Sequence, residues 1–476
     1  MRRKLDTLFA IDFRALAFFR VAAGAIVLID LLGRGADLGL HYTAAGVLPL
    51  ATLEAFFPRS SWAWSLHYYA DTAFWQGALF LFQAFAAACL VVGYRTRLAT
   101  FLTWLLLASL QARNPMVKYG ADDLLRLAIF WSMFLPLGAL WSVDSRRRRA
   151  GPPMPRSHLS AASAAILLQV CVMYIFSGLL KLGPEWQWGE ALAHALSFEM
   201  YATPLARMLA THADLVAHFG ALVPRLELVA ACLLFVPLAT ARWRVLALVL
   251  LAGFHLTTLA LLAAGIFPFV ALACLSLFLP AAVWDALEDM AFRLRERRSP
   301  APRTEQPERS APGRGRGWVP VATNVFVGLL FLYVVAWNVV GLGLEDYTRN
   351  HRLEWVEEHW QAGGKGLPVM TRDDTVARML GGLGWVGRVA ALEQRWDMFY
   401  RASARGRGWH MVVGTQEDGQ RISLLTGGRM IDEWPPPRPE DGPSLYPNAR
   451  WRVLFTFLRA SGLHPLRERL AAALHA

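Results

Sequence analysis

The sequence has few charged residues and few cysteines, and each shortage excludes a class of protein. Only 18% of the 476 residues are charged, whereas 55% are hydrophobic and the mean hydropathy is +0.34. A soluble globular protein needs a more highly charged surface than this. The four cysteines all lie within apolar segments, and none is spaced as a CxxC pair: Cys89, Cys171, Cys232 and Cys274. We expect small buried packing residues there, not disulfides or metal ligands.

The sequence also lacks the motifs of several activities. It contains no Gly-rich phosphate loop, no nucleophile elbow and no group of residues with metal-ligand spacing. ATP-driven transport and a metal centre are therefore not expected. No cleavable signal peptide is expected either, because Met1-Arg2-Arg3-Lys4 precedes an apolar segment without a small-residue cleavage site.

Long apolar runs are abundant instead. A helix needs about 20 apolar residues to cross a hydrocarbon core, and such runs recur along the chain. The pattern predicts an all-α polytopic membrane protein of about nine transmembrane helices, with the lipid bilayer as its first partner. The expected spans are 15–32, 72–92, 98–110, 124–140, 159–182, 226–240, 245–263, 266–284 and 319–340.

The formal net charge of +12 comes mainly from short basic clusters between the apolar runs. This distribution follows the positive-inside rule and gives no reason to expect a nucleic-acid partner. The clusters occupy every second connection: Arg2, Arg3 and Lys4; Arg95 and Arg97; 146–149; Arg242 and Arg244; and 293–316. Nine alternating spans fit this order, with the N-terminus in the cytoplasm and the C-terminal portion outside.

Composition divides the chain into four parts. Residues 1–290 hold the first eight spans, and 319–340 form the last one. Between them, 291–318 are basic and Pro-rich, and we expect a disordered cytoplasmic linker. Residues 345–476 are more polar and predict a small extracytoplasmic α+β module.

Two strands and a helix are expected within this module. Residues 409–413 and 421–425 have strand patterns, and Asp418-Gly419 between them supplies the backbone freedom of a tight hairpin. Residues 449–463 predict a helix.

Lys181 is the most informative polar residue. It lies at the end of the apolar run 159–182 and is followed by Gly183-Pro184-Glu185-Trp186. One interpretation is a helix-end anchor whose long side chain reaches the membrane surface. The other is a buried amine, shielded by Trp186 and Trp188, that is held for chemistry.

Other unusual polar residues fall on the same outer side. Tyr42 follows the first span, Asn114 and Asp122 precede the fourth, and His255 lies at mid-depth in the seventh. Ionisable residues are costly in lipid and usually face a cavity or the bundle interior. We therefore expect an outward-opening polar cavity bordered by both Asp122 and Lys181. His255 by itself is more typical of a hydrogen bond between helices than of a ligand.

Several segments together resemble one family. They are FRVAAG (19–24), HYTAAGVLP (41–49), NP (114–115), GADDLLR (120–126), FLPLG (134–138), WSVD (141–144), YIFSGLLKL (174–182) with Trp186, and FHL (254–256). Over roughly 8–290 the chain resembles the HTTM (horizontally transferred transmembrane) domain family, bacterial membrane relatives of vitamin K-dependent gamma-carboxylase. WDMF (396–399), Trp409 and Asp418-Gly419 resemble the tail that often follows that domain.

The resemblance implies a cellular location, a cofactor and a reaction. The place is the bacterial inner membrane, and the cofactor is reduced vitamin K or a similar menaquinol-type quinol. In the carboxylase a lysine deprotonates this quinol, which leads to epoxidation and to carboxylation of a glutamate in a protein or peptide substrate. Gly178-Leu179-Leu180-Lys181-Leu182 with Trp186 matches the stretch around that lysine. Lys181 is thereby implied as the general base.

The same resemblance supplies the remaining candidate residues. Those expected to bind the substrate or quinone are Asn114, Asp122, Trp186, His255 and Tyr42. Two positions depart from the carboxylase, which has a second lysine at Leu180 and a histidine at Pro115.

Three functions therefore compete. The first is a quinol-dependent, carboxylase- or epoxidase-like enzyme with Lys181 as its base. The second is a non-catalytic membrane scaffold that binds a quinone or a lipid. A small-molecule transporter is the third, although the sequence has no internal repeat and no matching pair of broken helices.

Overall fold

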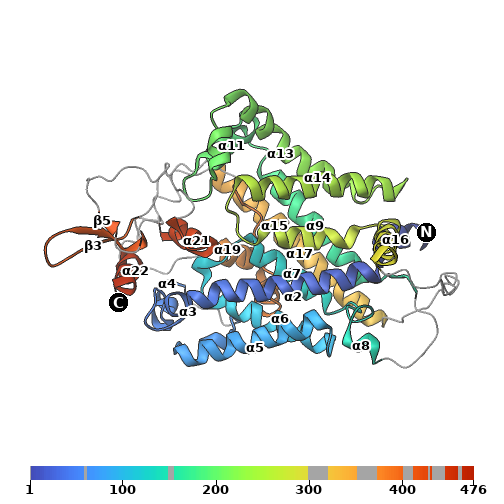
Figure 1. Cartoon of the computed structure of the whole chain (residues 1–476), viewed down its shortest axis with the longest axis horizontal. Coiled ribbons are helices and arrows are strands. Elements are labelled where there is room, and N and C mark those ends of the chain that lie inside the picture. Colours follow the sequence, from blue (N-terminus) through green and yellow to red (C-terminus); the bar gives the residue numbers. More distant parts are fainter. Residues whose placement is uncertain are drawn as a thin grey trace.

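Long helices lying side by side form most of the structure, which is a computed structural model (Figure 1). It describes residues 2–57, 62–147, 155–298, 320–350, 372–399, 411–426, 429–430, 445–458 and 464–475. The helices are α1 (Arg2–Phe9), α2 (Phe13–Ala36), α3 (Leu38–Tyr42), α4 (Leu50–Phe56), α5 (Ala73–Val92), α6 (Thr96–Arg113), α7 (Gly120–Ser132), α8 (Val143–Arg146), α9 (Ala161–Leu180), α10 (Pro184–Gln187), α11 (Glu190–Ser197), α12 (Pro204–Leu209), α13 (Ala213–Leu233), α14 (Thr240–Leu261), α15 (Phe267–Leu275), α16 (Ala281–Arg298), α17 (Val321–Asn350), α19 (Arg372–Met379), α20 (Gly384–Val389), α21 (Ala449–Leu458) and α22 (His464–His475). The strands are β1 (Ile11–Asp12), β2 (Ser157–His158), β3 (Val413–Thr415), β4 (Arg421–Ser423) and β5 (Arg429–Met430). β1 pairs antiparallel with β2, and β3, β4 and β5 form an antiparallel sheet in that order.

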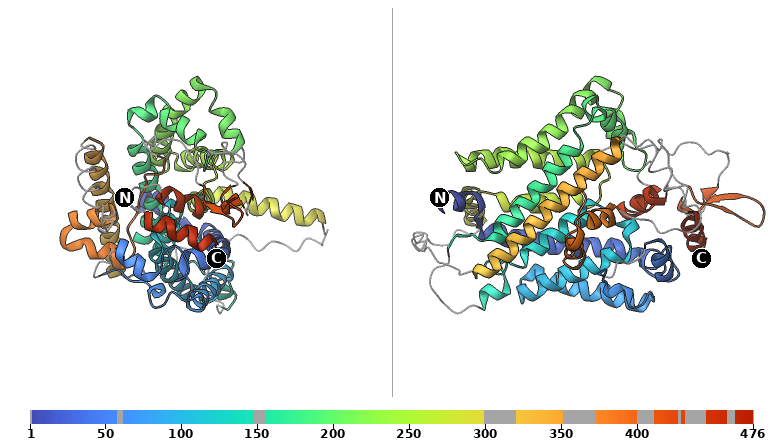
Figure 2. Two further views of the ribbon diagram at one scale, coloured as in Figure 1. Left: turned by 90° about the vertical axis from the view of Figure 1, so that its left-hand side faces the viewer. Right: turned by 180° about the vertical axis from the view of Figure 1, so that it is seen from behind.

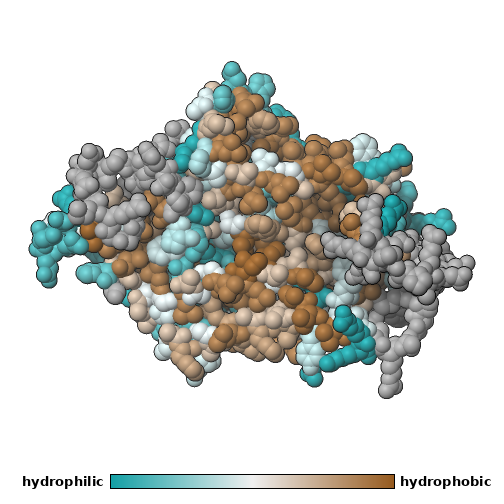
Figure 3. Space-filling model, viewed as in Figure 1, coloured by the Kyte–Doolittle hydropathy of each residue, from teal (hydrophilic) through white to brown (hydrophobic). Residues whose placement is uncertain are grey.

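Within the described residues, six helices are long and apolar enough to cross a membrane: α2, α5, α9, α13, α14 and α17. The bent pair formed by α15 and α16 would be a seventh. Figure 3 shows the corresponding surface, on which apolar residues fill the middle and hydrophilic ones gather towards the two sides of the view. The chain is therefore a multi-pass membrane protein.

Each of the nine expected spans overlaps a helix, although not all of these helices are candidate spans. α7 has only 13 residues, all of them buried, and the chain turns away before Pro136. α15 ends at Leu275, and the chain bends by 102° before α16, with Pro280 at the bend. The figure of nine crossings stays a prediction.

The predicted start of the sixth span was also wrong. α13 begins at Ala213, whereas the expected span began at 226, so part of the expected outer loop is helical. The preceding residues form the short helices α10, α11 and α12. Pro224 lies inside α13 without ending it.

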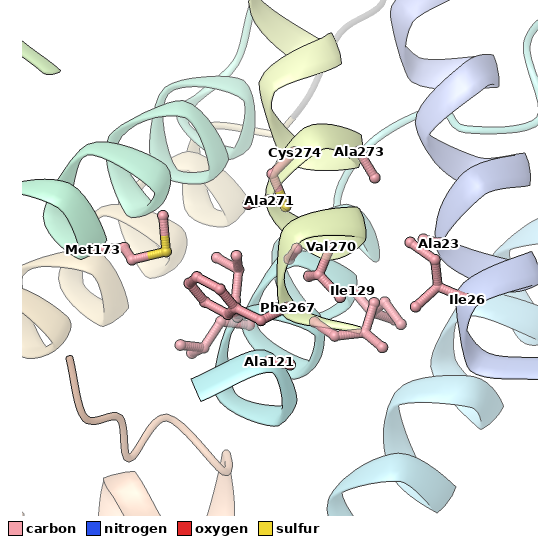
Figure 4. Close-up of a cluster of buried hydrophobic side chains, with 14 of the residues drawn as sticks. Ala23, Ile26, Ala121, Ile129, Met173, Phe267, Val270, Ala271, Ala273 and Cys274 are labelled. Carbon is pink, nitrogen blue, oxygen red and sulfur yellow. The ribbon is translucent and has the colours of Figure 1, made fainter. Parts of the chain in front are cut away.

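α15 lies in the middle of the bundle. Figure 4 shows it between α2, which contributes Ile26, and α9, which contributes Met173, with α7 alongside. Ala271, Ala273 and Cys274 of α15 are buried there. These small side chains let neighbouring helices approach closely, which is how helices associate where lipid removes the hydrophobic drive between them.

The C-terminal region packs into the same core as the membrane helices. Gln394 accepts a hydrogen bond on Oε1 from Gln169 Nε2 of α9 at 2.7 Å. Its backbone carbonyl accepts another from Trp337 Nε1 of α17 at 3.2 Å. Leu392 and Trp396 on either side are also buried. Residues near 394 are therefore part of the bundle, and a separate extracytoplasmic module stays a prediction.

The local predictions for this region have mixed outcomes. β3 and β4 form a hairpin with Gly419 at φ 84°, but β3 begins only at Val413, the last residue of the expected strand 409–413. α21 begins where the helix was expected. Residues 409–410 and 459–463 lie outside the described residues. Of the expected linker, 291–298 belong to α16 and are helical instead, while 299–318 are not described.

A buried cluster of two arginines and two carboxylates joins α21 to α2 and α7. Arg450 donates to Asp122 Oδ2 at 2.8 Å, to Asp122 Oδ1 at 2.9 Å and to Asp30 Oδ1 at 2.7 Å. Arg34 donates to Asp30 Oδ2 at 2.7 Å and to Asp122 Oδ1 at 2.6 Å. All four residues are buried. Two positive and two negative charges thus neutralise one another away from water.

This arginine–carboxylate cluster predicts a large effect of Arg450→Met. The substitution leaves two buried carboxylates facing one guanidinium, and breaking a buried ion pair costs about 3–5 kcal/mol. We expect a clearly lower thermal unfolding temperature of the full chain in detergent. Arg97→Met, at an exposed position of α6, is the control and should change it little. Equal unfolding temperatures of the two variants would contradict the prediction.

Candidate ligand-binding cavity

A cavity of about 450 Å³ lies between α9, α11, α13, α14 and α21. Most of its lining is apolar or aromatic, including Met173, Trp186, Leu196, Phe198, Phe219, Val223, Phe254, Leu261, Phe267, Met398, Phe399 and Val453. Its volume lies within the range of small-molecule sites, about 300–1,000 Å³. Phe219 of α13 and Thr257 of α14 are exposed lining residues, so the cavity has an open rim along these two helices.

Lys181 and Glu227 form a buried ion pair in the wall of this cavity. The Lys181 ammonium donates to both carboxylate oxygens of Glu227 at 2.9 Å and also to Ser177 Oγ. Ser177 lies one helical turn before Lys181, and its hydroxyl donates to Glu227 Oε1 at 3.3 Å. The ammonium lies 5.7 Å from the centre of the Trp186 ring. Its charge is therefore surrounded by a carboxylate, a hydroxyl and an aromatic face.

A glycine brings the two helices of this pair together. Gly178 of α9 lies against α13, where an added Cβ would be 2.9 Å from Leu228 Cγ and 3.2 Å from the Pro224 carbonyl oxygen. Any larger residue would push the helices apart. The resulting close approach sets the short distance between Lys181 and Glu227, two residues from different helices.

Burial distinguishes between the two interpretations of Lys181. The residue is 4% exposed, and Glu227 is 3% exposed. A helix-end anchor would extend its ammonium to the membrane surface. Lys181 instead directs it to a carboxylate inside the protein, so the anchor interpretation does not fit.

Tyr174 and His255 form a second polar pair on the cavity lining. The Tyr174 hydroxyl and His255 Nε2 are 2.7 Å apart, and His255 is completely buried. The rings of Phe254 and Phe267 pack against the imidazole at 5.2 and 5.6 Å. His255 Nδ1 has no hydrogen-bond partner among the described residues. A bound molecule with a polar oxygen could supply one.

Three of the six candidate residues line the cavity together: Lys181, Trp186 and His255. The other three lie elsewhere. Asp122 belongs to the arginine–carboxylate cluster, where Tyr42 Oη accepts from Arg34 Nη1 at 2.7 Å. Asn114 Nδ2 donates to the His41 carbonyl at 2.8 Å. The expectation that one cavity borders both Lys181 and Asp122 was wrong, because paired arginines hold Asp122 in a separate cluster.

Sequence reasoning missed Glu227 and Tyr174. Glu227 could have been identified from the sequence, because an acidic residue inside an expected span is itself a candidate functional residue. Tyr174 carries no such signal, because the high cost of an ionised side chain in lipid, which marks Glu227, does not apply to an uncharged tyrosine. Among the described residues, no three His, Cys, Asp or Glu side chains are grouped as a metal site.

The ion pair predicts a non-additive effect of two substitutions. Lys181→Met and Glu227→Gln each leave the partner charge buried alone, which costs about 3–5 kcal/mol. The double variant leaves no uncompensated charge, so it should be much less destabilised than the sum of the single variants. Thermal unfolding of the four proteins in detergent measures the coupling. Strict additivity would show that the pair is not formed.

The comparisons with known proteins identify a family by sequence alone. No curated protein and no solved structure matches the chain. The HTTM domain matches residues 9–284, which is more than half of the chain and includes Lys181, Glu227, Tyr174 and His255. The protein belongs to the HTTM domain family, which confirms the resemblance found in the sequence.

Proposed function

We propose that the cavity binds a membrane quinol and that Lys181 acts as a general base towards it. The observation that carries this proposal is a lysine–carboxylate pair buried in the wall of an otherwise mostly apolar cavity. Apolar walls suit the ring and tail of a quinol, and a few polar groups suit its hydroxyls. A bound quinol would supply an acidic ring hydroxyl and the capacity for oxidation.

Glu227 provides an acceptor for the proton that Lys181 must lose before it can act as a base. A general base must be neutral when it acts, whereas an isolated ammonium in an apolar cavity has no nearby group to take its proton. The Glu227 carboxylate, 2.9 Å away, can accept that proton and leave a neutral amine beside a neutral acid. Lys181 can then take a proton from a ligand hydroxyl. The net charge of the pair is unchanged until that second transfer.

The proposed role is deprotonation of a quinol, which would make the quinol easier for dissolved oxygen to oxidise, and not carboxylation of glutamate. Leu180 and Pro115 stand where the carboxylase has a lysine and a histidine. Pro115 begins a short 3₁₀ turn, and Met116 and Val117 beside it are buried. These positions therefore offer no further polar side chain to such a reaction.

Non-catalytic binding of a quinone or lipid is the second candidate. The completeness of the ion pair favours it, because Glu227 and Ser177 already satisfy the Lys181 ammonium. A scaffold or carrier would need only the apolar walls and an electrically neutral polar end. The enzymatic candidate requires that Lys181 lose its proton, whereas the non-catalytic candidate does not.

Lys181→Arg and Lys181→Leu separate the candidates. Arginine keeps the charge but does not deprotonate at usable pH, and leucine removes both charge and base. If Lys181 is a base, both purified variants should lose the protein-dependent oxidation of menaquinol-4 in air, measured at a temperature where circular dichroism shows that they remain folded. An arginine variant that oxidises the quinol at the wild-type rate would reject the base role. Binding of menaquinone-4 without any protein-dependent oxidation would favour the second candidate.

We also propose that the protein lies in a bacterial inner membrane with its N-terminus in the cytoplasm. Basic segments meet at one end of the bundle, as the positive-inside rule requires. There Arg244 donates to the Leu8 carbonyl, and Arg95 N donates to Asp144 Oδ1 at 2.9 Å. Figure 1 places the N-terminus at this end and the C-terminus, with β3 and β5, at the other.

Cysteine labelling tests this orientation. In a variant without the native cysteines, Asp418→Cys in the β3–β4 turn should react with a membrane-impermeant maleimide in intact cells with a permeable outer membrane. Lys4→Cys in α1 should react only after lysis. The reverse pattern would invert the topology and place the C-terminal region in the cytoplasm.

A further inference from the structure

The HTTM domain does not enclose the cavity by itself. The family match ends at residue 284, yet five lining residues lie beyond it: Met398, Phe399, Ala449, Val453 and Thr456. The last three belong to α21. In Figure 2, the C-terminal helices lie against the end of the bundle opposite the N-terminus. Part of the cavity wall is therefore supplied by a segment that the family domain does not include.

Two glycines fit this C-terminal wall closely against the HTTM domain. Gly265 has φ 64°, and an added Cβ there would lie 2.6 Å from the Ala449 Cβ. An added Cβ at Gly120 would lie 2.4 Å from Met398 Sδ. Gly265 leaves no room for a side chain, whereas at Gly120 the Met398 side chain would have to move. Arg450, next to Ala449, fixes α21 further through the arginine–carboxylate cluster.

The two parts of the cavity supply different kinds of contact. The charged and ion-paired groups, Lys181 and Glu227, come from the HTTM domain. The C-terminal wall supplies apolar side chains and the Thr456 hydroxyl, and none of its lining residues is charged. Uncharged walls discriminate between ligands by size and shape, and each methylene that fits or clashes changes affinity appreciably.

We infer that the C-terminal region, through the α21 wall that Val453 lines, determines which size of ligand the cavity accepts. The inference rests on the proposed function, because it takes this cavity as the ligand site. The HTTM domain then recognises the polar head, while α21 selects among molecules that share that head. A series of quinones that share one head group and differ in tail length therefore tests these separate roles.

Val453→Trp in the full-length protein tests the inference. The probes are 2-methyl-1,4-naphthoquinones with side chains of one, two and four isoprene units, and equilibrium dialysis in detergent gives each Kd. An indole at Val453 takes up space in the cavity, so the longest probe should lose about tenfold or more in affinity relative to the shortest. The matched control is Val413→Trp on exposed β3, which does not line the cavity and should leave the ratio unchanged.

Two further variants separate failure of the inference from misfolding and from failure of the proposed function. Val453→Ala enlarges the cavity without risk of a clash, and it should shift preference towards longer tails even if the tryptophan variant fails to fold. Lys181→Leu should weaken all three probes alike. Unchanged ratios in both Val453 variants, with normal wild-type binding, would overturn the inference alone. If the wild-type protein binds none of the probes, the proposed function fails and the inference with it.

Discussion

The cost of burying charge in a low-dielectric interior governs how this chain is arranged. A lone buried ion is unfavourable by several kcal/mol even after the protein relaxes, so it must be stabilised by an opposite charge or by good hydrogen bonds. Two places show how the chain meets this requirement. Arg34 and Arg450 neutralise Asp30 and Asp122, and Glu227 neutralises Lys181.

The arginine–carboxylate cluster connects parts of the chain that are far apart in sequence. Asp30 and Arg450 are separated by 420 positions, and Asp122 and Arg450 by 328. Their pairing fixes α21 at the end of the bundle, beside Tyr119, whose ring lies 5.1 Å from the Arg450 guanidinium. Tyr119 and α21 both line the cavity. The cluster that stabilises the fold therefore also positions one wall of the candidate site.

The Lys181–Glu227 pair gives the cavity a polar end without a net charge. An apolar ligand with a polar head can enter such a site without facing an uncompensated ion, and the pair can still exchange a proton internally. Tyr174 and His255 add a second polar position, with His255 Nδ1 unpaired among the described residues. The arrangement serves either proton transfer or simple recognition, and the two differ in whether the lysine must become neutral.

Local sequence patterns determined the membrane class, the positions of the helical segments and the family. Hydropathy and turn residues act over short stretches of chain, so they also identified Lys181 at the end of α9 and the hairpin at Gly419. The breaks after α7 and α15 show the limit of such patterns, because apolar residues continue through Pro136 and Pro280 while the helices do not. Hydropathy measures how favourably residues transfer into lipid, and it does not indicate whether a helix continues through them.

Only the tertiary structure decided which polar residues meet. Lys181, Trp186 and His255 come together, whereas Asp122 pairs with Arg34 and with Arg450 from the opposite end of the chain. Glu227 reaches Lys181 because Gly178 lets α9 and α13 approach closely. Such pairings depend on helix rotation and on the distance between helices. The packing of the whole bundle sets both, and no single segment encodes them.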